Sequence, residues 1–133
     1  MQQGILRTVI GIVAGVGMTI ATISLCEYVG HLIWPLPPGL DPMKPDQMAQ
    51  ILAAMPFAAK LSIAVGWFLG TLVGGFVALG LSKRTWAPWP IAALVIAGGI
   101  ANGLMFPHPL WMDVAAVVAP VLGAWIATRL GKA

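Results

Sequence analysis

The chain has 133 residues, of which 59% are hydrophobic and only 8% are charged, whereas soluble domains carry about 25% charged residues. This composition excludes a water-soluble globular domain, because too few polar side chains are present to cover its surface. The net charge of +3 arises without any basic cluster longer than Lys83-Arg84, so nucleic acid is not an expected partner. A single cysteine, Cys26, excludes an intramolecular disulfide. We therefore expect an all-α integral membrane protein.

Four long apolar segments predict transmembrane helices, because about 20 helical residues cross ~30 Å of hydrocarbon and a helix satisfies its own backbone hydrogen bonds in lipid. The predicted spans cover about residues 4–34, 57–82, 88–106 and 110–130. With the connecting segment 35–56 they occupy nearly all of residues 1–133. The sequence thus predicts a single transmembrane domain folded as a four-helix bundle.

The segment 35–56, between the first and second spans, is the longest connection. It opens with Pro35-Leu36-Pro37-Pro38-Gly39, which favours an extended backbone. From Asp46 onward, apolar residues recur at the spacing of one helix face, namely at Met48, Ile51, Leu52 and Met55. We expect a short amphipathic helix on the outer membrane surface or across the mouth of the bundle, with an ordered loop as the alternative.

The basic residues set the predicted orientation. Five of them lie at helix ends that share one side of the membrane: Arg7, Lys83, Arg84, Arg129 and Lys132. Only Lys44 and Lys60 lie on the other side. Because cytoplasmic loops carry the excess of lysine and arginine, both termini are predicted to be cytoplasmic, an N-in/C-in topology.

Glycines spaced four residues apart indicate where the helices pack. Such faces let two helix backbones approach closely in lipid, where hydrophobic burial does not drive association. The residues concerned are Gly66, Gly70 and Gly74 in the second span and Gly99 and Gly103 in the third. Since the run in the second span is the longest, we expect that helix at the centre of the bundle or at a subunit interface.

The predicted topology places all four acidic residues and both histidines on the outer side. The candidate ligand-binding residues there are Glu27, His31, Lys60, Asn102, His108 and Asp113. Polar and ionisable groups near or within a membrane are costly, which favours a functional role. Three interpretations stay open: interfacial residues that face water or each other, a pocket for an ion or polar ligand, or a metal site such as zinc held by Glu27, His31 and His108.

The motif content argues against an enzyme. There is no nucleophile elbow, phosphate-binding loop or HExxH sequence, and no cofactor is expected. We expect a protein that acts by association in the lipid bilayer, as an accessory or scaffolding subunit of a larger membrane complex or as a self-associating bundle. The alternative is a small homo-oligomeric channel or transporter with the outer polar cluster as its entrance, although no charge lies mid-membrane. A metal-binding membrane protein is the third possibility.

Short strings along the chain resemble a group of small four-helix bacterial membrane proteins without an assigned function. The strings are Glu27-Tyr28-Val29-Gly30-His31, Pro37-Pro38-Gly39, Gly74-Gly75-Phe76-Val77-Ala78 and Pro107-His108-Pro109-Leu110-Trp111. The resemblance implies multi-pass insertion in the bacterial inner membrane. It implies no activity, so no catalytic residue follows from it.

Overall fold

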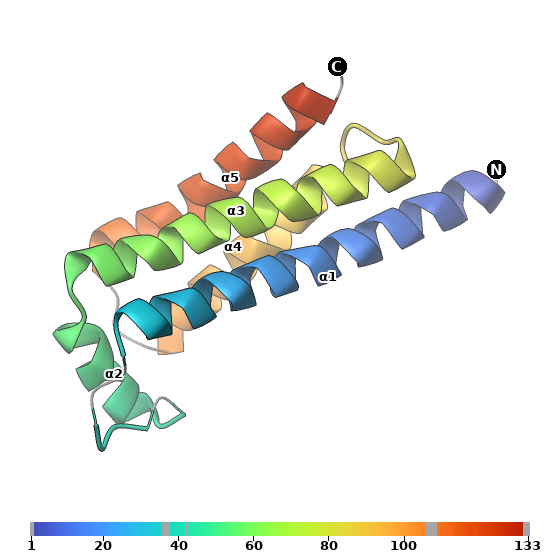
Figure 1. Cartoon of the computed structure of the whole chain (residues 1–133). Helices are drawn as coiled ribbons and strands as arrows, with labels where there is room; N and C mark the ends of the chain where they lie inside the picture. Colours follow the sequence, from blue (N-terminus) through green and yellow to red (C-terminus); the bar gives the residue numbers. More distant parts are fainter. Residues whose placement is uncertain (1, 36–37, 42, 106–108, 132–133) are drawn as a thin grey trace.

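A computed structural model describes the chain except for residues 1, 36–37, 42, 106–108 and 132–133. The described part forms five helices, α1 (Gln2–Ile33), α2 (Pro45–Ala54), α3 (Phe57–Ser82), α4 (Pro88–Met105) and α5 (Leu110–Gly131) (Figure 1). All except α2 are long and apolar enough to cross a membrane. The all-helical prediction is confirmed, and the structure supports a multi-pass membrane protein.

Prolines and charged residues mark the ends of the long helices. Helix α3 begins after Pro56, and it ends at Lys83, whose left-handed backbone (φ 62°) caps the helix. Helix α4 starts at Pro88, where a proline costs no hydrogen bond. Residue 106, the predicted last residue of the third span, lies outside the described part, as do two residues of the proline-rich segment, 36 and 37.

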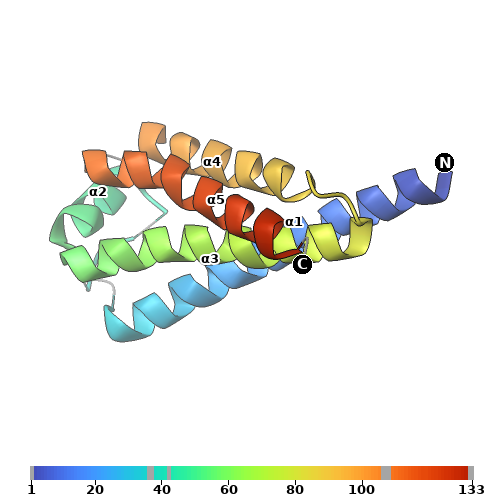
Figure 2. The same cartoon turned by 90° about the horizontal axis from the view of Figure 1, so that it is seen from above.

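Helix α3 occupies the centre of the bundle. It packs against α1, α4 and α5, and the views in Figures 1 and 2 show it between α1 and α5. Of its most apolar stretch 50% is buried, against 17% for α1. Helix α1 therefore meets the rest of the bundle mainly through α3 and leaves most of its circumference outside.

Close backbone approach joins α1 to α3. A Cβ added at Gly70 would lie 2.6 Å from Ile23 Cγ1, and one added at Gly74 would overlap Thr19 Oγ1. The Thr19 hydroxyl donates a hydrogen bond of 3.0 Å to the Gly70 carbonyl oxygen. From the other side, a Cβ at Gly15 would lie 2.7 Å from the Gly74 carbonyl oxygen. Glycines on both helices are thus required for this contact.

Small residues also hold α4 and α5 in place. A Cβ at Gly123 of α5 would lie 2.9 Å from the carbonyl oxygen of Phe68 in α3. A Cβ at Gly99 of α4 would lie 2.9 Å from the Cβ of Ala116 in α5. Gly103, predicted to share this face, is only half-buried.

The two ends of the bundle differ in charge. The start of α1, the α3–α4 turn and the end of α5 lie together, as Figure 1 shows. This end, which we call the basic end, carries Arg7, Lys83, Arg84 and Arg129. Arg7 Nε donates a hydrogen bond of 2.8 Å to the Leu81 carbonyl oxygen there. Lys132 lies outside the described residues, and α2 lies at the opposite end, which we call the α2 end.

Candidate functional site: a blind cavity at the α2 end

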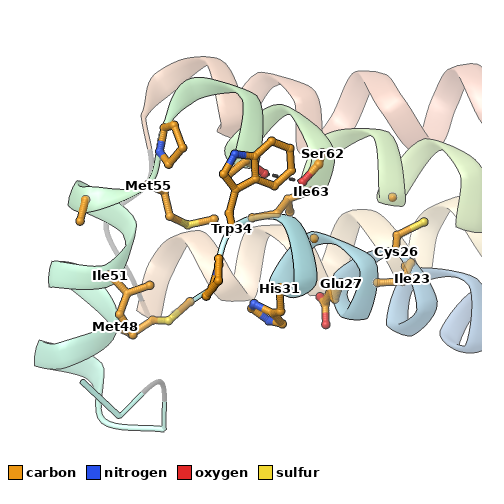
Figure 3. Close-up of a pocket in the computed structure, with 16 residues that line it drawn as sticks. Ile23, Cys26, Glu27, His31, Trp34, Met48, Ile51, Met55, Ser62 and Ile63 are labelled. Carbon is orange, nitrogen blue, oxygen red and sulfur yellow. Dashed lines mark hydrogen bonds between the residues drawn. The ribbon is translucent and has the colours of Figure 1, made fainter. Parts of the chain in front are cut away.

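A cavity of about 220 Å³ lies where α1, α2 and α3 meet (Figure 3). Helix α1 contributes a single face to it, because its lining residues recur every three or four positions. They are Ile23, Cys26, Glu27, Gly30 and His31, and Trp34 directly follows the helix at the same spacing. The pair Glu27 and His31, expected to share a helix face, is therefore brought to one site.

Helix α2 forms a second wall of the cavity. Pro45 in its first turn starts the helix at a position where the missing N–H costs nothing. Ile51 and Leu52 are buried, whereas Asp46 is exposed, so the helix is amphipathic as the apolar spacing predicted. Met48, Ile51 and Met55 line the cavity, and Figure 3 shows their side chains along the side that faces α1.

The start of α3 closes the third side. Ser62 and Ile63 line the cavity, and Figure 3 shows the Trp34 indole extending from the end of α1 toward both of them. The Ser62 hydroxyl donates to the Ala59 carbonyl oxygen at 2.6 Å within its own helix. That hydroxyl is thereby held by the helix and is not paired with a base.

The cavity is blind. Its deepest lining residues are Ile23 and Cys26 on α1 and Gly66 on α3. A Cβ at Gly66 would lie 3.3 Å from Cys26 Cβ, and one turn farther along α3 the Gly70–Ile23 contact brings the two helices closer still. No passage toward the basic end continues from this cavity through the described α1–α3 contact.

The cavity is apolar with one charged edge. Among the described residues that line it, Glu27 is the only one with a formal charge at neutral pH. Glu27 and His31 are both exposed, and Figure 3 shows them side by side on one edge of α1. The remaining polar groups in the lining are the Ser62 hydroxyl, the Trp34 indole N–H and the Cys26 thiol.

Other residues proposed from the sequence lie outside this cavity. Lys60 is half-buried at the start of α3, Asn102 is exposed on α4, and Asp113 is exposed in the first turn of α5. None of these three lines the cavity. His108 lies outside the described residues. The structure thus brings together Glu27 and His31 from the predicted cluster.

A metal site is not assembled within the described part of the chain. That part contains no group of three or more histidine, cysteine, aspartate and glutamate side chains able to hold a metal ion. The predicted ligand set of Glu27, His31 and His108 includes a residue outside it. The two ligands on α1 alone fall short of the four-coordinate arrangement usual for zinc.

The sequence-based interpretation did not assign Trp34, Met48 or Ser62 to a binding site. The signal that could have identified Trp34 is helical spacing, because it follows Gly30 by four residues and His31 by three. The arrangement is suited to binding a ligand, because apolar walls lie beside an exposed carboxylate. Comparisons with protein-family models, curated proteins and solved structures give no match to this chain.

Proposed function

We propose that this chain is a non-enzymatic, multi-pass membrane protein that acts by association, as an accessory or scaffolding subunit of a larger membrane complex or as a self-associating bundle. The observation that supports this best is the closed interior of the bundle. None of the buried side chains among the described residues is charged, and the buried polar side chains are Thr19, Thr71 and Ser82. Each of the three has a hydrogen bond to the backbone. Such an interior favours association over catalysis or ion conduction within one chain.

The basic end is the proposed cytoplasmic side. Lysine and arginine are retained on the cytoplasmic side of inner-membrane proteins, and the described part of the basic end carries no carboxylate to offset its cations. Both ends of the chain would then be cytoplasmic, and α2 with its cavity would face the outside of a bacterial inner membrane.

The free side of α1 is the proposed contact surface. Gly17, Ala21 and Ser24 are exposed there, and a Cβ added at Gly17 would meet no atom within 4 Å. A lipid-exposed helix gains nothing from small residues, whereas a partner helix can approach closely over them. Association through this side would bury part of the surface that α3 leaves uncovered.

The second candidate function is a small homo-oligomeric channel or transporter. The cavity favours it, because Glu27 and His31 lie at its edge on the end of the bundle opposite the basic end. Since the cavity is closed near Gly66, any path across the membrane would have to run between chains. A metal-binding protein is the third candidate and needs a third ligand from outside the described residues.

The test is purification in mild detergent after expression at native level, with the mass of the assembly and its subunits measured by native mass spectrometry. We expect a defined complex with a larger partner or with copies of the chain. The double variant Gly17→Leu/Ala21→Leu should lose this association, while the control Ile20→Leu keeps it. Equal helicity and melting temperature of the variants would show that the fold is intact.

A wild-type chain that purifies as a monomer without a partner would refute the association proposal. A homo-oligomer that conducts ions in liposomes would favour the channel or transporter. Measured zinc near one atom per chain, lost in His31→Ala, would instead support the metal-binding candidate.

A further inference from the structure

The volume of the cavity at the α2 end limits the size of a ligand that it can hold. An apolar cavity of about 150 Å³ in a protein accommodates benzene, so about 220 Å³ has room for one ring with a short substituent. Ile23 and Ile63 provide rigid apolar walls, and Met48 and Met55 provide flexible ones. The body of the ligand is therefore small and apolar.

The negative charge at the edge of the cavity selects the polar group of the ligand. Glu27 lies at the edge of the cavity, and no lysine or arginine side chain is among its described lining residues. An anion would be repelled there, while an amine or quaternary ammonium would be attracted by the carboxylate. The α2 end as a whole has the same sign, since all four aspartate and glutamate side chains belong to it together with only two lysines.

Trp34 adds an aromatic wall to the apolar part of the cavity. It lines the same cavity as Glu27, seven residues farther along the chain, and Figure 3 shows its indole toward α3, with Glu27 on the opposite edge of α1. The indole therefore faces the body of the ligand. The carboxylate at the edge of the cavity favours an ammonium-bearing ligand over a neutral one of equal shape.

We propose that the cavity formed by α1, α2 and α3 at the α2 end binds a small lipophilic cation, with the apolar body against the isoleucine, methionine and Trp34 side chains and the ammonium group beside Glu27. The site needs only one chain, so it goes beyond the proposed association and does not depend on it. A ligand of this kind partitions into the membrane–water interface, from which the cavity would be reached.

The experiment compares two probes that differ only in charge. Benzyltrimethylammonium carries the cation, and neopentylbenzene replaces its nitrogen with carbon. Binding of each is measured by equilibrium dialysis against the wild-type chain in phosphatidylcholine nanodiscs, with empty nanodiscs subtracted. We expect saturable binding of the cation near one per chain, tighter than that of the neutral probe by on the order of tenfold.

Variants assign that preference to named side chains. Glu27→Gln should weaken binding of the cation on the order of tenfold and leave binding of the neutral probe unchanged, which also shows that the cavity is intact. Asp46→Asn is the matched control, because Asp46 is an exposed carboxylate of the same end that does not line the cavity.

Three outcomes would overturn the proposal. The first is the absence of saturable binding of the cation above empty nanodiscs. The second is equal affinity for the two probes in the wild-type chain. The third is an Asp46→Asn effect as large as that of Glu27→Gln, because the preference would then come from the diffuse charge of the α2 end. Each of these results leaves the association measurements untouched.

Discussion

The contact between α1 and α3 gives the sharpest test of the packing, through the variant Gly74→Ala. The added Cβ would overlap Thr19 Oγ1 and would lie 2.5 Å from the Gly15 carbonyl oxygen. A backbone oxygen has no alternative rotamer, so α1 must move away from α3. Overpacking of this kind costs about 1–3 kcal/mol, and loss of the Thr19–Gly70 hydrogen bond adds about 0.6 kcal/mol. The greater helix propensity of alanine offsets at most ~1 kcal/mol.

We therefore expect Gly74→Ala to lower the free energy of unfolding by about 1–3 kcal/mol. The assay is reversible unfolding in mixed micelles with increasing dodecyl sulfate, followed by circular dichroism. Gly80→Ala is the control on the same helix, because a Cβ there would meet no atom within 4 Å. It should keep or slightly raise stability. If both variants unfold at the same dodecyl sulfate fraction, the close α1–α3 contact is refuted.

Two further predictions use the same assay. Thr19→Val removes the hydrogen bond between α1 and α3 and should lower the free energy of unfolding by about 0.6 kcal/mol. The control is Thr22→Val, which should cost less, because the Thr22 hydroxyl bonds within α1 to the Met18 carbonyl oxygen. Equal losses of stability in the two variants would contradict the interhelical bond. The rings of Phe57 and Trp111 lie 5.1 Å apart and tilted by 48°, so a double-mutant cycle with leucine at both positions should give a coupling energy of about 0.5 kcal/mol, and a coupling of zero would show that the rings do not meet.

The four long apolar helices and the short helix α2 were predictable from the sequence because they depend on local properties. Apolar length identifies a segment that can cross lipid, and prolines such as Pro56 and Pro88 mark helix starts. The spacing of Ile51 and Leu52 within the segment 35–56 predicted the face of α2 that the structure buries. The predicted membrane orientation depends instead on the balance of cations between the two ends of the bundle.

The candidate site was only partly predictable, because it depends on how helices are rotated against each other. Glu27 and His31 are four residues apart and share a face of α1 in any helix. Asn102 and Asp113 were expected near them from depth in the membrane alone, but depth does not fix the direction in which a side chain points. In α4 the contact of Gly99 with Ala116 sets the rotation of the helix, and Asn102 is left exposed.

The cavity and the glycine contact are consequences of one change along α3. From Gly74 to Gly66 the residues that face α1 have no side chain, so the backbones touch. One turn nearer the α2 end Ser62 and Ile63 stand in place of these glycines on α3, and the Trp34 indole extends toward both of them from the end of α1. These side chains and α2 fill only part of the space between the helices. The shape of the cavity thus depends on the rigid contact beneath it, so Gly74→Ala should weaken binding of benzyltrimethylammonium while Gly80→Ala should not.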